Sequence, residues 1–334
     1  MAVLAAKPAG DDRLSGVIMT GVLLQGWRLL TQHKKAIFFL YLANLMVAAF
    51  LLVPFMETFD RSLGPGLYRE QMVGSLDYDW YTLFRDRVTG FASTFAPWVM
   101  GAGPFAKNLE TLLDGEMSDF PWEILSLGGL YVLLQTFLLA AALGSFALDP
   151  KGISTREFFR TGAAFFGRFF RLSVLALLTF WMIDSWIIGP LTSLVNEMGE
   201  GALTDRGAFY WNLSRYLLLL VLFMVVNMLF DYAKIKAAVE DRTSMILSFF
   251  SGVVFCKRYF LSAFALYLVI AWVGVMGVLV YTGVEHVLPQ QTWLPILLAV
   301  LWQQLYLIAR VSIRLFFYTS QMQFYLEREG FNRE

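Results

Sequence analysis

The feature that most constrains this chain is a series of long apolar runs with few charged residues. A helix of about 20 residues, at 1.5 Å per residue, spans the roughly 30 Å hydrocarbon core of a bilayer. Six runs approach that length, at 36–55, 124–148, 172–188, 215–230, 260–280 and 293–308. The sequence therefore predicts an all-α, polytopic membrane protein with six transmembrane helices in a single membrane domain, residues 1–334.

Composition agrees with this class and excludes others. Hydrophobic residues make up 58% of the 334 residues and charged residues only 16%, against about 25% in soluble globular domains. The formal net charge is zero, so no nucleic-acid partner is expected. A single cysteine, Cys256, excludes an internal disulfide and any cysteine-based metal site, and no motif predicts a cofactor.

The distribution of lysine and arginine predicts the orientation. Of the 26 basic residues, 19 lie in four segments that the six spans place on one side: the N-terminus to Lys35, 151–171, 234–258, and the chain from Arg310 onward. The other side holds the remaining 7. Because cytoplasmic loops carry an excess of Lys and Arg, we expect both termini in the cytoplasm.

Residues 57–123 form the longest polar stretch and are expected to be an extracytoplasmic insertion between the first two spans. Acidic residues outnumber basic ones there by 11 to 5. Short helices are predicted at 77–88 and 104–113. Two interpretations stay open: a small cap packed on the bundle, or a docking surface for a partner or substrate. A second outer loop is predicted at 191–211.

Three amphipathic segments precede spans and are expected to lie as elbow helices in the plane of the lipid headgroups, at 17–30, 154–171 and 244–258. In the second, a Ser154-x-x-Glu157 capping box starts the helix, and phenylalanines gather on one face. Basic side chains on the second and third elbows are expected to contact lipid phosphates: Arg156, Arg160, Arg168, Arg171, Lys257 and Arg258.

The three elbows align on Gly26, Gly162 and Gly252. A span, an outer loop and a returning span follow each one, so the chain is predicted to consist of three elbow–span–loop–span units. Each glycine allows its elbow to approach a neighbouring span closely. Common selection for amphipathic helices before spans is the alternative explanation of the same pattern.

Three motifs carry a family resemblance over about residues 15–330: Phe158-Phe159-x-x-Gly162-x-x-Phe165-Phe166-x-Arg168, then Asp231-Tyr232-Ala233-Lys234-Ile235 ahead of Glu240-Asp241-Arg242, and Phe250-x-Gly252-x-x-Phe255-x-x-Arg258. The chain resembles six-span bacterial membrane proteins with elbow helices, such as the membrane domain of some glycerophosphodiester phosphodiesterases and related uncharacterised families. The resemblance implies a bacterial inner-membrane setting. It does not imply phosphodiesterase chemistry, because this sequence holds no soluble catalytic domain, and the 57–123 insertion departs from the pattern.

A charged cluster is expected at the cytoplasmic ends of spans 4 and 6. Asp231 and Lys234 are three residues apart, which lets them pair on one helix face. The cluster is interpreted either as a lock that sets how the spans meet or as a gate or partner contact. Its predicted members are Asp231, Lys234, Glu240, Asp241, Arg310 and Arg314.

Four polar residues lie within the apolar runs: Asp184, Asn227, Gln303 and Gln304. Ionisable groups in spans are costly and often functional. Asp184 is interpreted either as an interfacial residue or as an ion or proton site facing the bundle. Asn227 is expected to form an interhelical hydrogen bond, and the two glutamines either line a cavity or bind a neighbouring helix.

The sequence holds no P-loop, no zinc-protease motif and no nucleophile elbow. We therefore expect a non-enzymatic subunit or scaffold of an inner-membrane complex, with membrane lipids and either another membrane protein or a second copy as partners. A transporter, permease or lipid-handling protein is the alternative. A third hypothesis is an enzyme that uses the outer carboxylates Asp77, Asp79 or Asp184.

Overall fold

Long helices dominate the structure. The computed structural model describes residues 16–63, 77–89, 92–93, 95, 103–115, 122–200, 205–288 and 292–330. Within these ranges the chain is helical and has no strand. Six helical stretches are long and apolar enough to cross a membrane, which confirms the predicted number of spans.

The helices follow one another along the chain with short connections. Their bounds are α1 (Gly16–Gln32), α2 (Lys34–Leu63), α4 (Tyr78–Arg87), α5 (Gly103–Asp114), α6 (Trp122–Leu148), α7 (Thr155–Ile183), α8 (Gly189–Glu200), α9 (Asp205–Val239), α10 (Met245–Arg258), α11 (Phe260–Val287) and α12 (Trp293–Arg328). A π-helical turn, Asp184–Ile188, joins α7 to α8, and the three together make one of the six long stretches.

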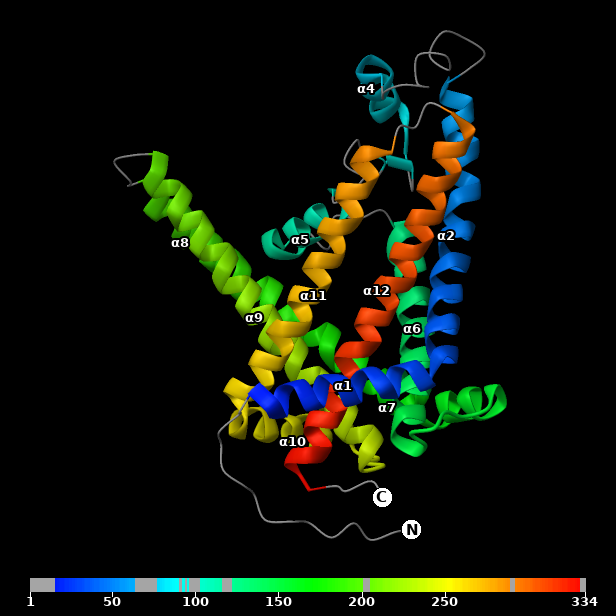
Figure 1. Cartoon of the computed structure of the whole chain (residues 1–334). Helices are drawn as coiled ribbons and strands as arrows, with labels where there is room; N and C mark the ends of the chain where they lie inside the picture. The colour runs from blue at the N-terminus through cyan, green and yellow to red at the C-terminus, as the bar shows by residue number, and fades with distance from the viewer. Residues whose placement is uncertain are drawn as a thin grey trace.

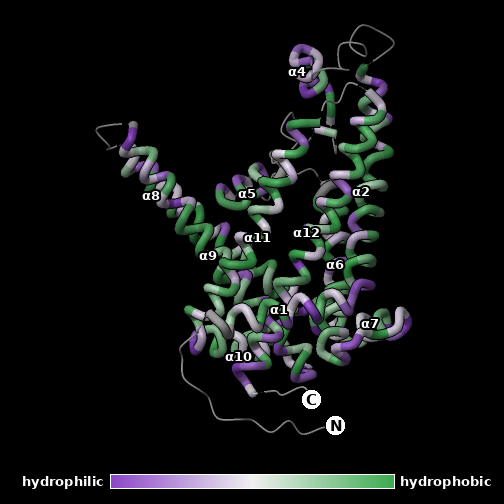
Figure 2. The backbone as a smooth tube through the Cα atoms, in the orientation of Figure 1, coloured by the Kyte–Doolittle hydropathy of each residue, from purple (hydrophilic) through white to green (hydrophobic). Residues whose placement is uncertain are grey.

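One end of the molecule, which we call the basal end, gathers the elbow helices. There α1 and α10 lie across the ends of the long helices, and the last turns of α12 end beside them (Figure 1). From this end α2, α6 and α12 rise together, whereas α8 and its neighbour α9 diverge from them (Figure 1). Figure 2 shows apolar residues along much of the rising helices, with hydrophilic residues gathered towards the basal end and the far tips.

The main hydrophobic core lies at the basal end. α9 and α12 are 35 and 36 residues long, well beyond the about 20 that a bilayer requires. Their last turns are buried, as Tyr232, Ile235 and Tyr325 show with 1% exposure or less. One continuous cluster joins these turns to α1, α6 and α7. The spans are therefore held together mainly where they meet the elbows.

Each predicted elbow packs against the end of a span, and its aligned glycine lies at the contact. The contacting pairs are Gly26 with Ser320 of α12, Gly162 with Ala141 of α6, and Gly252 with Ala233 of α9. A Cβ added at the three glycines in turn would lie 2.5, 3.0 and 3.1 Å from the nearest atom of that span. At Gly26 a Cβ would force the two helices apart, and at Gly162 and Gly252 it would lie closer than an ordinary van der Waals contact. The second and third elbows rest on the span that precedes them, and the first rests on the last span.

The third elbow, α10, buries one face against the protein and exposes an apolar face on the other side. Ser248 and Gly252 are buried, whereas Ile246, Phe250 and Val254 are between 61% and 67% exposed. A helix with an exposed apolar face beside a protein core is suited to the boundary between headgroups and acyl chains.

Two predictions of local structure were wrong. The second elbow and the third span form one helix, because no glycine or proline interrupts the chain between Arg168 and Ile183. The predicted loop at 191–211 is largely helix, in α8 and the start of α9. Pro190 stands where the π-helical turn passes into α8, and a displaced hydrogen-bond ladder accommodates a residue without an N–H.

The two short helices predicted in the 57–123 insertion are confirmed as α4 and α5. Asp77 caps α4, since its Oδ1 accepts from the backbone N–H groups of Asp79 and Trp80 at 2.9 and 3.0 Å. Trp80 then stacks in an aromatic cluster with Phe84 and with Phe59 near the end of α2. The described part of α4 is thus a small aromatic cap on α2.

Candidate functional site

The predicted charged cluster forms around Lys234 of α9. Lys234 Nζ lies 3.2 Å from Asp231 Oδ1 and donates to the hydroxyl oxygen of Tyr318 in α12 at 3.2 Å. The lysine and aspartate side chains are only 17% and 13% exposed. Because a charge that is largely removed from water needs partners, both contacts keep Lys234 in place. The lysine thereby joins α9 to α12.

Arg314, one helical turn before Tyr318, reaches a third helix. Its Nη1 donates to Gln135 Oε1 of α6 at 3.1 Å. Gln135 is 5% exposed, and its Nε2 has no hydrogen-bond partner among the described residues. We call Gln135, Asp231, Lys234, Arg314 and Tyr318 the central polar cluster. It connects α6, α9 and α12.

Glu240 and Asp241 form a second group, apart from the central polar cluster. Glu240 Oε1 lies 3.5 Å from Lys236 Nζ and accepts from the Tyr325 hydroxyl of α12, while Oε2 pairs with Arg242. Asp241 pairs with Arg168 of α7. The six-residue cluster predicted from the sequence is therefore two groups, and the second ties the end of α9 to both α7 and α12.

The other predicted basic residues point outward. Exposed side chains on the elbows and their junctions are Arg156, Arg160, Arg171, Lys257 and Arg258. Arg168 differs from these residues, because its guanidinium forms an ion pair with Asp241. Arg310 is exposed as well and pairs with none of the residues that the structure describes, so the structure joins it to neither group. It lies one turn before Arg314 on α12, on a part of the helix that packs less closely.

The polar residues predicted within the spans have different surroundings. Gln304 accepts from the Tyr41 hydroxyl of α2 at 2.7 Å and so binds a neighbouring helix. Gln303 and Asn227 are exposed. No described residue hydrogen-bonds to the Asn227 side chain, so the expected bond is not formed within this chain. The reason is the rotation of α9, which buries the adjacent Met228 instead.

Asp184 opens the π-helical turn and faces the end of α5. A Cβ added at Gly115, which has φ 78°, would lie 2.6 Å from Asp184 Oδ1. The aspartate therefore lies against another part of the protein, at the place where α7 passes into α8.

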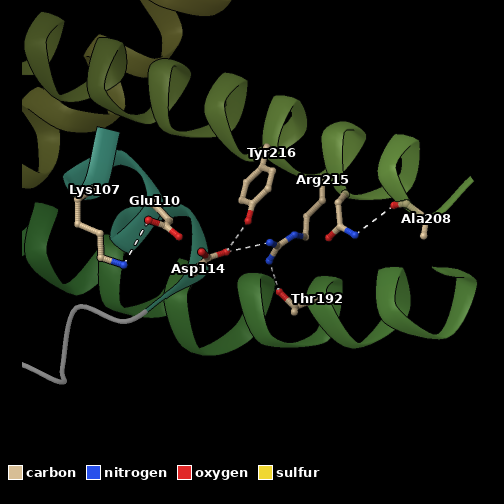
Figure 3. Close-up of polar contacts among 8 residues, drawn as sticks. Lys107, Glu110, Asp114, Thr192, Ala208, Arg215 and Tyr216 are labelled. Atoms are coloured by element: carbon tan, nitrogen blue, oxygen red, sulfur yellow. Dashed lines mark hydrogen bonds and ion pairs between the residues drawn. The ribbon is translucent and has the colours of Figure 1, made fainter. Parts of the chain in front are cut away.

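A buried ion pair near Asp184 was not predicted. Arg215 of α9 has a side chain only 5% exposed, and its Nη2 lies 2.8 Å from Asp114 Oδ1 at the end of α5. Nη1 donates to Thr192 Oγ1 of α8 at 2.7 Å, and the Tyr216 hydroxyl donates to the same Asp114 oxygen at 3.2 Å (Figure 3). The network joins α5, α8 and α9. Its two charges are 101 residues apart, and no sequence spacing relates them.

These groups have no arrangement typical of a reaction centre. Among the described residues, no three His, Cys, Asp or Glu side chains are placed to hold a metal ion. Cys256 is 1% exposed, and burial raises the pKa of its thiol to about 12, which keeps the thiol protonated at neutral pH. The polar groups join neighbouring helices, and most basic side chains of the elbows are exposed at the basal end.

In comparisons with protein-family models, curated proteins and solved structures, none matches this chain.

Proposed function

We propose that the chain is a non-enzymatic, multi-pass subunit or scaffold of a bacterial inner-membrane complex. The observation that carries the proposal is the uneven burial of its spans. In the most apolar part of each span, 61% of the residues are buried in α6, but only 17% in α2 and 6% in α12. Most side chains in this part of α12 are therefore not buried by the rest of the chain.

The divergence of the helices adds to this support. Lipid tails can cover exposed apolar side chains, so exposure by itself does not indicate a protein partner. Here, however, α8 and α9 diverge from α2 and α12 beyond the basal core (Figure 1). Transmembrane helices associate by packing along their lengths. Spans held together at one end leave room beyond it for helices from another chain or a second copy.

The orientation with both termini in the cytoplasm is part of the same proposal. Its support is the excess of Lys and Arg in the segments that the six spans place on one side of the membrane. The three-unit organisation is also proposed, and its support is the glycine contact that each elbow makes with a span end.

Gentle extraction tests the proposal. The tagged full-length chain is extracted in native-membrane nanodiscs and cross-linked, and the mass of the complex is measured. The proteins and lipids that co-purify with it are identified. The proposal expects a stoichiometric membrane protein or a defined homo-oligomer with cross-links to α2, α8 or α12. A monomer accompanied only by lipids contradicts it.

A transporter or lipid-handling protein is the second candidate, favoured by the buried Arg215–Asp114 pair. Ion pairs inside membrane proteins often mark a pathway, and this one lies at the base of the diverging helices α8 and α9. Purified protein in liposomes is assayed for movement of ions, lipids and small solutes, with Asp114→Asn as the comparison. Movement that depends on Asp114 favours this candidate, and its absence favours the scaffold.

A further inference from the structure

A small pocket lies where the corner between α1 and α2 meets the turn between α6 and α7. Its volume is about 180 Å³, and its walls include Gln32, His33, Lys35, Lys151, Gly152 and Phe158. A second pocket of about 420 Å³ adjoins it and shares Gly152. The second pocket combines apolar walls, such as Leu148 and Phe165, with Arg160 and with the carboxylates of Asp149 and Glu157.

Two spans place the pocket at the depth of the lipid headgroups. α2 begins at Lys34 and becomes apolar from Ala36, while α6 ends its apolar run at Leu148. The two helices lie side by side, since the Tyr131 hydroxyl of α6 donates to Asn44 Oδ1 of α2 at 2.6 Å. The start of one span and the end of the other therefore mark the same level. This holds whichever side of the membrane the basal end faces.

The cations around the pocket retain hydrogen-bond donors that no described residue uses, although the Glu157 carboxylate attracts Lys35 and Arg160. Lys35 Nζ donates one hydrogen bond, to the Ile153 carbonyl at 2.9 Å, and an ammonium has three donors. Lys151 and Arg160 form no ion pair with any described residue. The carboxylate of Glu157, on the wall of the second pocket, already accepts from the Ser154 backbone N–H at 2.8 Å.

The inner wall holds a buried nitrogen that lacks a partner. His33 is 5% exposed, its Nδ1 lies 2.9 Å from the Leu29 carbonyl, and its ring packs edge-on against Phe146. Its Nε2 has no hydrogen-bond partner in the described part of the chain. Buried polar atoms of this kind commonly hold a water or an ion. Because Nδ1 donates to the Leu29 carbonyl, Nε2 of the neutral ring is an acceptor, and a water that bridges Nε2 to a bound anion supplies the donor that Nε2 lacks.

The space itself depends on Gly152. This residue has φ 93°, in the left-handed region that favours glycine. An added Cβ would lie 2.8 Å from the Gln32 carbonyl oxygen. The turn can therefore lie against the end of α1 only with glycine here.

We propose that this pocket is a specific phosphate-binding site, formed by Lys35 and Lys151, and that the apolar walls of the second pocket receive the adjoining part of an anionic phospholipid. The inference goes beyond the scaffold function and does not rest on it. A phosphate can come from a lipid headgroup or from a soluble phosphate ester, and the experiment separates these sources.

The test measures binding of phosphatidylglycerol to the delipidated full-length protein by native mass spectrometry. Lys151→Gln is compared with Lys34→Gln, which removes the same charge from an exposed lysine outside the pocket. Loss of one charge-assisted hydrogen bond weakens binding by about tenfold or more. We expect Lys151→Gln to bind one phosphatidylglycerol about tenfold more weakly, and Lys34→Gln to bind it as the natural chain does. Arg160→Gln is an independent second variant, expected to weaken the same lipid.

A second experiment replaces the lipid with glycerol phosphate and measures the thermal stability of the delipidated protein and its variants. If glycerol phosphate stabilises the protein only when Lys151 is present, and phosphatidylglycerol does not bind, the phosphate site is supported and its ligand is a soluble ester. Phosphatidylglycerol binding that is equal in Lys151→Gln, Arg160→Gln and Lys34→Gln, with no effect of glycerol phosphate, overturns the proposal. Lys35→Arg retains the charge and is expected to bind as the natural chain does.

Discussion

At the scale of single residues, the contact between α1 and α12 depends on Gly26. A Cβ there would lie 2.5 Å from Ser320 Oγ and 2.8 Å from its Cα, so the two helices must separate. We expect Gly26→Ala to lower stability by about 1 to 3 kcal/mol, the usual cost of overpacking, measured as the thermal unfolding of the detergent-solubilised protein.

Gly21 in the same helix is the matched control. An added Cβ there meets nothing within 4 Å. Since alanine favours helix over glycine by about 1 kcal/mol, Gly21→Ala should leave stability unchanged or raise it. Equal losses from both substitutions would show that α1 tolerates no alanine in general and that the close contact is not the cause.

Removing the charge of Asp114 should lower the stability of the protein strongly, because Asp114 pairs with the buried Arg215. Asp114→Asn leaves the 5% exposed arginine without a counter-charge, and breaking a buried pair in this way costs about 3 to 5 kcal/mol. Glu110→Gln, on the same helix, removes the exposed pair with Lys107 and should cost less than about 1 kcal/mol. Thermal unfolding of the two variants measures the difference, and similar melting temperatures would contradict the role given to Arg215.

Cys256 should resist alkylation in the folded protein. Its thiol is buried, and a pKa raised to about 12 leaves little thiolate at pH 8. N-ethylmaleimide at pH 8 should therefore add no mass to the natural chain. Val254→Cys, at a position 67% exposed on the same helix, should gain one label. Rapid labelling of Cys256 itself would show that α10 does not pack as described.

At the scale of elements, the central polar cluster links α9 to α12. Asp231 and Lys234 lie on one helix, so their pairing alone joins nothing, and the link between helices is the bond from Lys234 to Tyr318. We expect Asp231→Asn to cost about 3 kcal/mol, because the lysine then lacks its counter-charge. Arg310→Gln, at an exposed and unpaired position, should be neutral.

A double-mutant cycle tests whether Asp231 and Tyr318 act together on Lys234. Asp231→Asn and Tyr318→Phe act on the same ammonium, so their effects on thermal stability should be non-additive by about 0.5 to 3 kcal/mol. Strict additivity would mean that the two partners of Lys234 act independently, and the cluster would then not be a lock between helices.

At the scale of the whole molecule, the basal end is expected to face the cytoplasm. Because Cys256 is buried, single introduced cysteines report on sidedness with little background. Tyr78→Cys, in the exposed part of α4, should react with an impermeant maleimide in cells with an opened outer membrane. Lys257→Cys should react only after the inner membrane is permeabilised. The reverse pattern contradicts the orientation that the lysine and arginine distribution predicts.

Several features of this protein follow from the sequence by itself. The number of spans follows from apolar runs matched to bilayer thickness, a property that depends on each segment alone. The capping box at Ser154 and Glu157 and the pair Asp231–Lys234 were predictable because both lie within four residues along the chain. The close approaches at Gly26, Gly162 and Gly252 agree with the alignment of the elbows, although the sequence did not specify their partners.

Only the tertiary structure decided which distant groups meet. Arg215 pairs with Asp114 across 101 residues, and Arg314 bonds to Gln135 of α6, whereas Arg310, one turn earlier, bonds to no described residue. The rotation of each helix about its axis sets these contacts, and that rotation results from packing against several other helices at once. Local apolar periodicity determines that a helix forms and spans, whereas the position of a polar side chain depends on the combined packing of all its neighbours.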